Sequence, residues 1–263
     1  MRILLLLLTL TLTSSIRAQP PTFDWAKSVG GPSGFGQSIT TDLSGNVYVT
    51  GKFADTADFD PSVATYNLTS NGFWDIFVLK LDTGGNFIWA TSMGEGYDDV
   101  GYGITTDASE NVYVTGLFGG TVDFDPGVDS FNLISNGAFD VFLQKLNANG
   151  NLIWAISLGA MDSDRSYCLT IDAGGNVLIA GAFNDTVDFD PGVDTFNLIS
   201  TTWMRDAFIL KLDSNANFLW AKSFGGPNLD EVKSIAVDAS GNVHVTGRYN
   251  SRYPSVRHLL NNF

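Results

Sequence analysis

The segment Gly45-Asn46-Val47-Tyr48-Val49-Thr50-Gly51 decides the fold, because close copies of it return at 111–116, 175–181 and 241–247. A second landmark, the dipeptide Trp-Ala, recurs at spacings of 64, 65 and 66 residues: Trp25, Trp89, Trp154 and Trp220. Self-similarity at a fixed period is the signature of a repeat architecture. The 263-residue chain is therefore built from units of about 65 residues.

Each unit contains four short runs that are typical of β-strands. In the first copy these runs are rich in β-branched and aromatic residues: Ser38–Asp42, Val47–Phe53, Ile76–Leu81 and Phe87–Ser92. Loops of Asp, Gly and Asn join the first run to the second and the third to the fourth, and these residues favour tight turns. Four antiparallel strands per tandem unit are typical of a β-propeller blade. The sequence therefore predicts an all-β propeller, with a β-solenoid or sandwich as the alternative.

The two ends of the repeat region predict incomplete blades. Three full blades are expected from about residue 36 to residue 224, with Asp24–Val29 as an isolated fourth strand before them. Ser234–Arg248 supplies the first two strands of a further blade, after which the pattern stops. This end is either a terminal cap or a truncated reading of a longer propeller, and the abrupt stop favours truncation. Unpaired strand edges in such blades predict self-association.

The N-terminus has the order of a secretory signal peptide. A basic start is followed by the apolar run Ile3–Thr13 and by the small Ala18 before the expected cleavage point. The run is shorter than the ~20 apolar residues that a membrane span needs. We therefore expect a signal peptide at 1–18, a propeller domain at 19–248 and an atypical tail at 249–263, in a secreted or cell-surface protein without a membrane span.

The composition narrows the class of partner. The chain carries 28 acidic and 14 basic residues, a formal net charge of −14. This excess disfavours nucleic acid and anionic lipid as partners. The single cysteine excludes an intramolecular disulfide and a cysteine-based zinc site.

No catalytic residue is assigned from the sequence. A hydrolytic triad needs a histidine beside a nucleophile and an acid, and the two histidines are His244, on a predicted strand, and His258, in the tail. Both are interpreted as surface residues. Cys168 aligns with Ser38 and Gly103, a position that favours a small packed side chain, so it is interpreted as a core thiol.

Repeated aspartates in the insertion between the second and third strands are the main chemical signal. They follow the pattern Asp-x-Asp-x-x-x-Asp in two units: Asp123, Asp125 and Asp129, and Asp188, Asp190 and Asp194. Calcium takes about six to eight oxygen ligands, so three carboxylates with backbone and water oxygens would suffice. The alternative is a solvated acidic turn. The first unit keeps Asp58 and Asp60 but lacks the third Asp, so it is expected to bind calcium weakly or not at all.

The motifs at Asp42–Gly51 and Asp75–Asn86, with later copies at Asp107–Gly116 and Asp140–Asn151, resemble those of the secreted bacterial β-propeller repeat (SBBP-type) family. The segment Leu-Asp-x-x-Gly-Asn-x-x-Trp is also similar to the Trp-docking repeat of quinoprotein propellers. The resemblance covers nearly the whole mature chain and is specific for fold, while it implies little about activity.

These observations favour a non-catalytic secreted propeller that acts as an extracellular scaffold or binding module for a protein or a glycan. The alternative is an extracellular polysaccharide hydrolase or lyase that uses Asp residues on one propeller face. The cofactor expectation is limited to calcium at the two aspartate clusters.

Overall fold

The computed structural model describes residues 23–31 and 33–250, and every regular element in that part of the chain is a β-strand. The predicted signal peptide at 1–18 and most of the tail at 249–263 lie outside these residues. The all-β prediction is confirmed for the described part of the chain.

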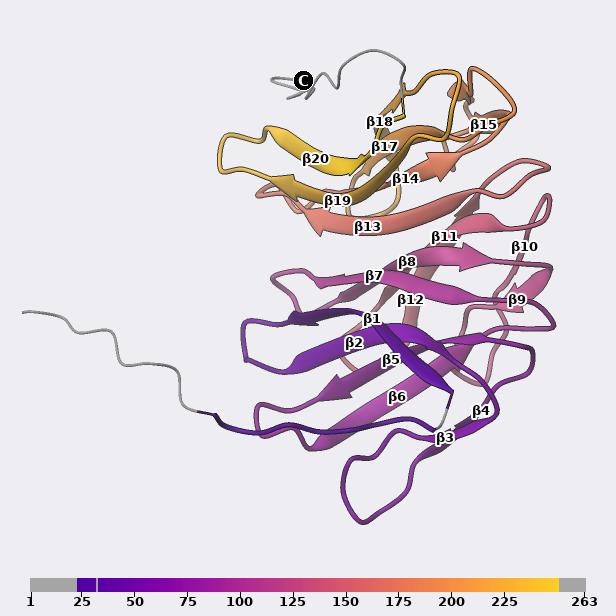
Figure 1. The fold of residues 1–263 in the computed structure, drawn as a ribbon. Helices are drawn as coiled ribbons and strands as arrows, with labels where there is room; N and C mark the ends of the chain where they lie inside the picture. The colour runs from indigo at the N-terminus through magenta and orange to yellow at the C-terminus, as the bar shows by residue number, and fades with distance from the viewer. Residues whose placement is uncertain (1–22, 32, 251–263) are drawn as a thin grey trace, which may run out of the picture.

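Three four-stranded antiparallel sheets and one two-stranded sheet follow one another along the chain (Figure 1). The first sheet contains β1 (Gly34–Thr41), β2 (Val47–Phe53), β5 (Asp75–Leu81) and β6 (Phe87–Met93). The second contains β7 (Val100–Thr106), β8 (Val112–Phe118), β11 (Asp140–Leu146) and β12 (Leu152–Leu158). The third contains β13 (Arg165–Ile171), β14 (Val177–Phe183), β17 (Asp206–Leu212) and β18 (Phe218–Phe224). The fourth contains β19 (Glu231–Val237) and β20 (Val243–Arg248).

The insertion in each full unit forms a small hairpin of its own, which we call an insertion hairpin. The three insertion hairpins pair strands of three residues: β3 (Thr56–Asp58) with β4 (Asn67–Thr69), β9 (Thr121–Asp123) with β10 (Asn132–Ile134), and β15 (Thr186–Asp188) with β16 (Asn197–Ile199). Each leaves the sheet between its second and third strands. The sequence predicted the insertion but not its two short strands.

The core lies between neighbouring sheets, because the central strands are covered on both faces. Every residue of β5, β8, β11 and β14 is buried. We call the first strand of each sheet (β1, β7, β13 and β19) its inner strand. Each inner strand carries a bulge, and the strand paired with it carries a glycine where the two backbones approach closely. A Cβ at Gly116 would overlap the carbonyl oxygen of Val100. The glycine that ends the Val-x-Val-Thr-Gly motif is therefore required by this close approach.

The predicted strand at Asp24–Val29 is wrong, because this segment carries no strand in the structure. A fourth strand pairs with the third strand of its own blade. The described part of the chain has no such third strand for residues 24–29. The segment lies along the first sheet instead, where the Trp25 indole donates a hydrogen bond of 2.9 Å to the Thr83 carbonyl.

Candidate functional site: the grooves between neighbouring sheets

The recurring tryptophans join each sheet to the next. Trp89, on β6 of the first sheet, donates from Nε1 to the Ala148 carbonyl of the second sheet at 3.1 Å. Trp154 makes the equivalent bond to the Ser214 carbonyl of the third sheet at 3.3 Å. Both acceptors lie in the tight turn between the third and fourth strands of the receiving sheet. Both indoles therefore lie between neighbouring sheets, and a hydrogen bond holds each of them to the next sheet.

The face of the Trp89 indole is occupied by protein. Gly150, which has a φ of +84°, covers it so closely that a Cβ there would lie 3.2 Å from the Trp89 ring. The ring of Tyr48 meets the indole edge to face, with ring centroids 6.2 Å apart. These contacts favour a structural role for Trp89 over stacking against a ligand.

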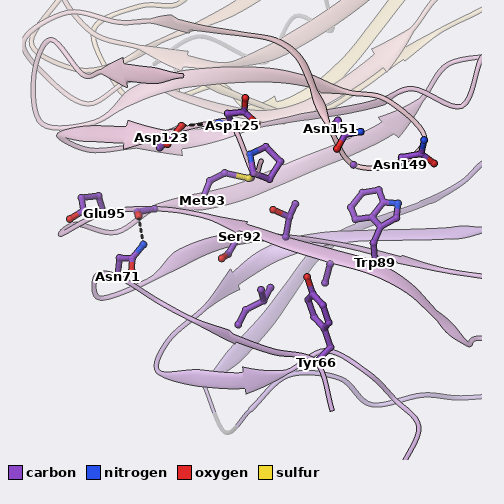
Figure 2. Close-up of a pocket in the computed structure, with 16 residues that line it drawn as sticks. Tyr66, Asn71, Trp89, Ser92, Met93, Glu95, Asp123, Asp125, Asn149 and Asn151 are labelled. Atoms are coloured by element: carbon purple, nitrogen blue, oxygen red, sulfur yellow. Dashed lines mark hydrogen bonds between the residues drawn. The ribbon is translucent and has the colours of Figure 1, made fainter. Parts of the chain in front are cut away.

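A polar groove of about 430 Å³ opens beside Trp89, between the first and second sheets (Figure 2). One wall is β6 with Tyr66 and Asn71 from the first unit, and the other is the second insertion hairpin with Asp123 and Asp125. Asn149 and Asn151, from the turn that receives Trp89, complete the rim. Amide, carboxylate and phenol groups therefore face the same open space.

An equivalent groove of about 400 Å³ lies between the second and third sheets. Its lining repeats that of the first groove one unit later: Trp154, Asp190, Pro191, Asn215 and Asn217 stand where Trp89, Asp125, Pro126, Asn149 and Asn151 stand. Two copies of one chemical surface are thus presented by neighbouring sheets.

The two grooves differ in the hydrogen bonding of one side-chain amide. In the third sheet the Asn217 side chain donates to Asp213 at 2.8 Å. In the second sheet the residue equivalent to Asp213 is Asn147, which accepts only the backbone N–H groups of Asn149 and Asn151. The exposed amide of Asn151 therefore has no partner among the described residues and faces the first groove.

The predicted calcium ligands lie in the second and third insertion hairpins, where they organise turns. Asp123 Oδ1 accepts the backbone N–H groups of Asp125 at 3.0 Å and of Phe131 at 2.8 Å. Burial alone would raise the pKa of Asp123, but these two bonds and a bond from the Ser130 hydroxyl lower it overall. Asp125 accepts the N–H of Gly127 at 2.8 Å, and Asp129 is exposed. Asp188 and Asp190 repeat these bonds in the third insertion hairpin, with Asp194 exposed.

The first insertion hairpin makes the same turn without the third aspartate. Asp58 accepts the N–H groups of Asp60 and Tyr66, and Asp60 accepts that of Ser62. Within residues 23–31 and 33–250, no three His, Cys, Asp or Glu side chains gather into a group that could hold a metal ion. The turn geometry accounts for the first two aspartates of each cluster, and calcium binding stays a prediction.

Sequence reasoning missed a second set of aspartates, which are buried where each sheet meets the next. One group begins the third strand of each sheet: Asp75, Asp140 and Asp206. The other directly precedes the next inner strand: Asp99, Asp164 and Asp230. Asp99 accepts the backbone N–H groups of Glu95 and Gly119, both at 2.9 Å. Burial raises the pKa of Asp99 and of Asp164 to about 7, and the neighbouring Asp75 and Asp140 carboxylates add to the effect. Their spacing of 65 and 66 residues was a signal available in the sequence.

The histidine and cysteine side chains in the described part of the chain have contacts that favour structural roles. His244 contacts Asp238 at 3.3 Å, in the position where Tyr48 donates to Asp42. Burial raises the pKa of the Cys168 thiol to about 12, which keeps it protonated and unreactive. His258 lies outside the described residues.

The four sheets and their tryptophan junctions define a class, that of propeller-repeat proteins, and comparison with known proteins agrees. Residues 24–52 match the SBBP β-propeller repeat family model, so the resemblance inferred from the motifs is confirmed. An uncharacterised WD repeat-containing protein of Acanthamoeba polyphaga mimivirus is 26% identical over 276 residues, which is 82% of this chain and 19% of the relative.

The regulatory protein FlaEY of Caulobacter vibrioides is 28% identical over 149 residues, covering 57% of this chain and 15% of that protein. The chain therefore spans about a fifth or less of the length of these curated relatives. A structure of a protein of unknown function from Bacteroides caccae aligns with 76% of this chain and 87% of its own, at 9% identity and a TM-score of 0.27. In the described part of the chain, no helix is long and apolar enough to cross a membrane.

Proposed function

We propose that this propeller-repeat chain is a secreted, non-catalytic binding module, and that the repeated grooves between its sheets bind a glycan. The observation that carries the proposal is the duplication of one polar surface, Trp-Asp-Pro-Asn-Asn, at two successive sheet junctions. A ligand made of repeating units is the natural match for a repeated site. Simultaneous engagement of both grooves would raise the apparent affinity without any new contact.

The groove chemistry supports a polyhydroxylated ligand. Sugar hydroxyls both donate and accept hydrogen bonds, and the amides of Asn149 and Asn151 and the carboxylate of Asp125 offer both kinds of partner. Both amides are exposed and have no side-chain hydrogen bond to the described part of the chain. Binding a sugar would therefore not require any bond within the protein to be broken.

A protein partner is the second candidate, favoured by the tips of the insertion hairpins. Val63, Val128 and Val193 occupy equivalent positions there and are fully exposed, at 106%, 102% and 102%. An apolar side chain repeated at three loop tips suits contact with another protein. Such a partner would bind the tips and leave the grooves open.

We also infer that the described sheets form an open arc, as expected from the incomplete last blade. The open face of the first sheet exposes 52% of Phe35 and 68% of Ile39. Such a face, and an outer edge of β20 that no strand in the described part of the chain covers, support self-association. Light scattering of the chain without residues 1–18 tests this proposal, and a stable monodisperse monomer would contradict it.

Glycan binding is tested by screening the same chain on a glycan array and measuring hits by calorimetry. The Asn149→Ala/Asn151→Ala variant should lose about tenfold in affinity, since each amide contributes about one hydrogen bond. Asn197→Ala is the matched control, because Asn197 is exposed on β16 and lines neither groove. Equal affinity of the parent, the double variant and the control variant would refute the groove as the glycan-binding site.

Two further readouts separate the alternatives. Loss of partner binding in Val128→Asp/Val193→Asp, with intact groove variants, would favour a protein partner. Turnover of a polysaccharide, measured as new reducing ends and abolished by Asp125→Asn, would make the chain an enzyme.

A further inference from the structure

A row of side chains follows the inner strands of the second, third and fourth sheets. Tyr102, Tyr167 and Lys233 each occupy the bulge of their strand, where the pairing register shifts. Bulges redirect a side chain and often lie beside functional sites. The rings of Tyr102 and Tyr167 are in contact, with centroids 5.3 Å apart, and Lys233 Nζ lies 3.3 Å from the Tyr167 centroid.

Two arginines lie close to this row. Arg165 begins β13, and Arg205 directly precedes β17 of the same sheet. Burial raises the pKa of Tyr102, while the positive charges of Arg165 and Arg205 act in the opposite direction. Both guanidinium groups therefore lie near enough to the phenol to interact with it electrostatically.

Both arginines carry a buried donor that no group in residues 23–31 and 33–250 satisfies. Arg165 Nε and Arg205 Nη1 are buried and have no hydrogen-bond partner there. Neither arginine forms an ion pair with the described part of the chain. A buried donor without a partner costs free energy, and native structures contain few of them.

The fold itself does not require arginine at these two positions. In the first unit the equivalent residues are Phe35 and Trp74, whose rings contact edge to face at 5.4 Å. In the second unit they are Val100 and Phe139. Two earlier copies of the same sheet thus accept uncharged residues there, so the arginine pair of the third sheet is a specific departure from the repeat.

The acids near the row do not neutralise the arginines. Glu231 pairs with Lys233 at 3.1 Å, and Asp98 raises the pKa of Tyr102 through its charge. In a chain of net charge −14, two guanidinium groups that act on one phenol and have no carboxylate partner among the described residues are unusual.

We propose that Arg165 and Arg205, beside Tyr102 and Tyr167, form a binding site for an oxyanion group of a small ligand. The guanidinium group has planar, paired donors that match carboxylate, sulfate and phosphate oxygens. An oxyanion between the two arginines would satisfy the buried donors, and the tyrosine rings would form an apolar wall beside it. This site is separate from the polar grooves, so it does not depend on glycan binding there.

Calorimetric titration of the chain in chloride buffer tests the site with three probes. Galacturonate presents a carboxylate on a sugar ring, while inorganic sulfate and inorganic phosphate present the bare oxyanion. Saturable binding is expected for at least one probe, and its identity distinguishes a sugar carboxylate from a free anion. Absence of saturable binding by all three would overturn the proposal.

The variant Arg165→Val/Arg205→Phe places the residues of the second unit in the third. It should lose binding by about tenfold or more, because both charged donors are removed. Its melting temperature without any probe should equal or exceed that of the parent, since unpaired buried donors disappear. Lys27→Met, a one-charge change at an exposed residue of the N-terminal segment, should keep the parent affinity.

Two results of this comparison would contradict the site. Unchanged affinity in the double variant would place the anion elsewhere. A large drop in its melting temperature without any probe would make the arginines structural.

Discussion

The first and second sheets are built from similar sequence repeats, yet the inner strand of the first sheet is exposed and that of the second is buried. Ile39 on β1 is 68% exposed, whereas the equivalent Ile104 on β7 is 5% exposed. The second sheet is covered on both sides by its neighbours, and the first sheet is covered fully on only one side. Burial in this molecule is therefore set by the presence of a neighbouring sheet, while the residue type stays the same.

The same comparison explains the buried aspartates. The backbone N–H of Gly119 in the second unit is satisfied by the Asp99 carboxylate. The equivalent N–H, that of Ala54 in the first unit, donates to the Ser33 carbonyl instead. The residue equivalent to Asp99 there is Gly34, which has no carboxylate. A junction between two sheets thus contains a buried carboxylate that the open side of the first sheet does without.

Truncation of the two isoleucines tests this difference in burial most directly. Ile104→Ala should lower the free energy of unfolding by about 3 kcal/mol, because a buried branched side chain leaves a cavity. Ile39→Ala should change it by about 0.5 kcal/mol or less, as is usual at exposed positions. Urea unfolding measures both. Equal losses would mean that a further sheet or a second copy covers β1 in solution.

Calcium binding is expected to distinguish the second and third insertion hairpins from the first. If the second and third insertion hairpins bind calcium and the first does not, calorimetry should report two sites. Each would add about 2.7 kcal/mol to stability at a hundredfold excess over Kd. Asp125→Asn should remove one site, whereas Asp58→Asn in the first insertion hairpin should leave both. An unchanged melting temperature in calcium and in chelator would make the clusters turn residues only.

Acid should stabilise the junction between the sheets. Asp99 and Asp164 have a pKa near 7 in the folded protein and near 3.8 when unfolded. Between these values the folded state binds more protons than the unfolded state, so stability falls as pH rises from about 4 to 7. The aspartates whose pKa is lowered, such as Asp172 at about 2, lose their contribution only below this window.

We expect the free energy of unfolding to be higher at pH 5 than at pH 8 by more than about 2 kcal/mol, since each of the two carboxyls titrates over about two pKa units in this range and one unit corresponds to about 1.4 kcal/mol. Urea titrations at the two pH values measure this difference. Asp99→Asn cannot ionise and should reduce the pH dependence even where it lowers overall stability. An identical pH dependence in this variant would show that Asp99 is ionised throughout.

The smallest effect concerns the tryptophan bond. Trp89→Phe keeps an aromatic ring but loses the donor to Ala148, and should cost about 1 kcal/mol. Trp25→Phe should cost less, because Trp25 lies on a segment without strand partners. Thermal melting of both variants measures which substitution costs more stability. A larger loss for Trp25→Phe would show that the N-terminal segment contributes more than its lack of strand pairing suggests.

The repeated motifs were enough to predict the sheets. The alternation and turn residues of 47–53 and 87–92 placed two strands within one residue of β2 and β6. Asp24–Val29 misled the prediction, because its Trp-Ala motif matches a fourth strand while backbone pairing depends on a strand elsewhere. Local sequence carries propensity, and pairing is a tertiary property.

The candidate site was only partly predictable. Asp125 attracted attention through its acidic pattern, but its place in a groove depends on β6 of the preceding sheet. Asn149 and Asn151 looked like ordinary turn residues, and the buried Asp99 looked like one more acid in an acidic chain. Their roles arise where two units meet, which a single repeat does not display.

The tryptophan junction also has a consequence for how such a chain changes over generations. Every unit offers an indole donor on one side and a turn carbonyl on the other, so neighbouring units join head to tail. Recombination that duplicates or deletes one whole unit leaves each surviving junction with both its partners. The number of copies can therefore drift while the contact between copies is preserved by selection, and stability grows roughly by one junction for each copy gained.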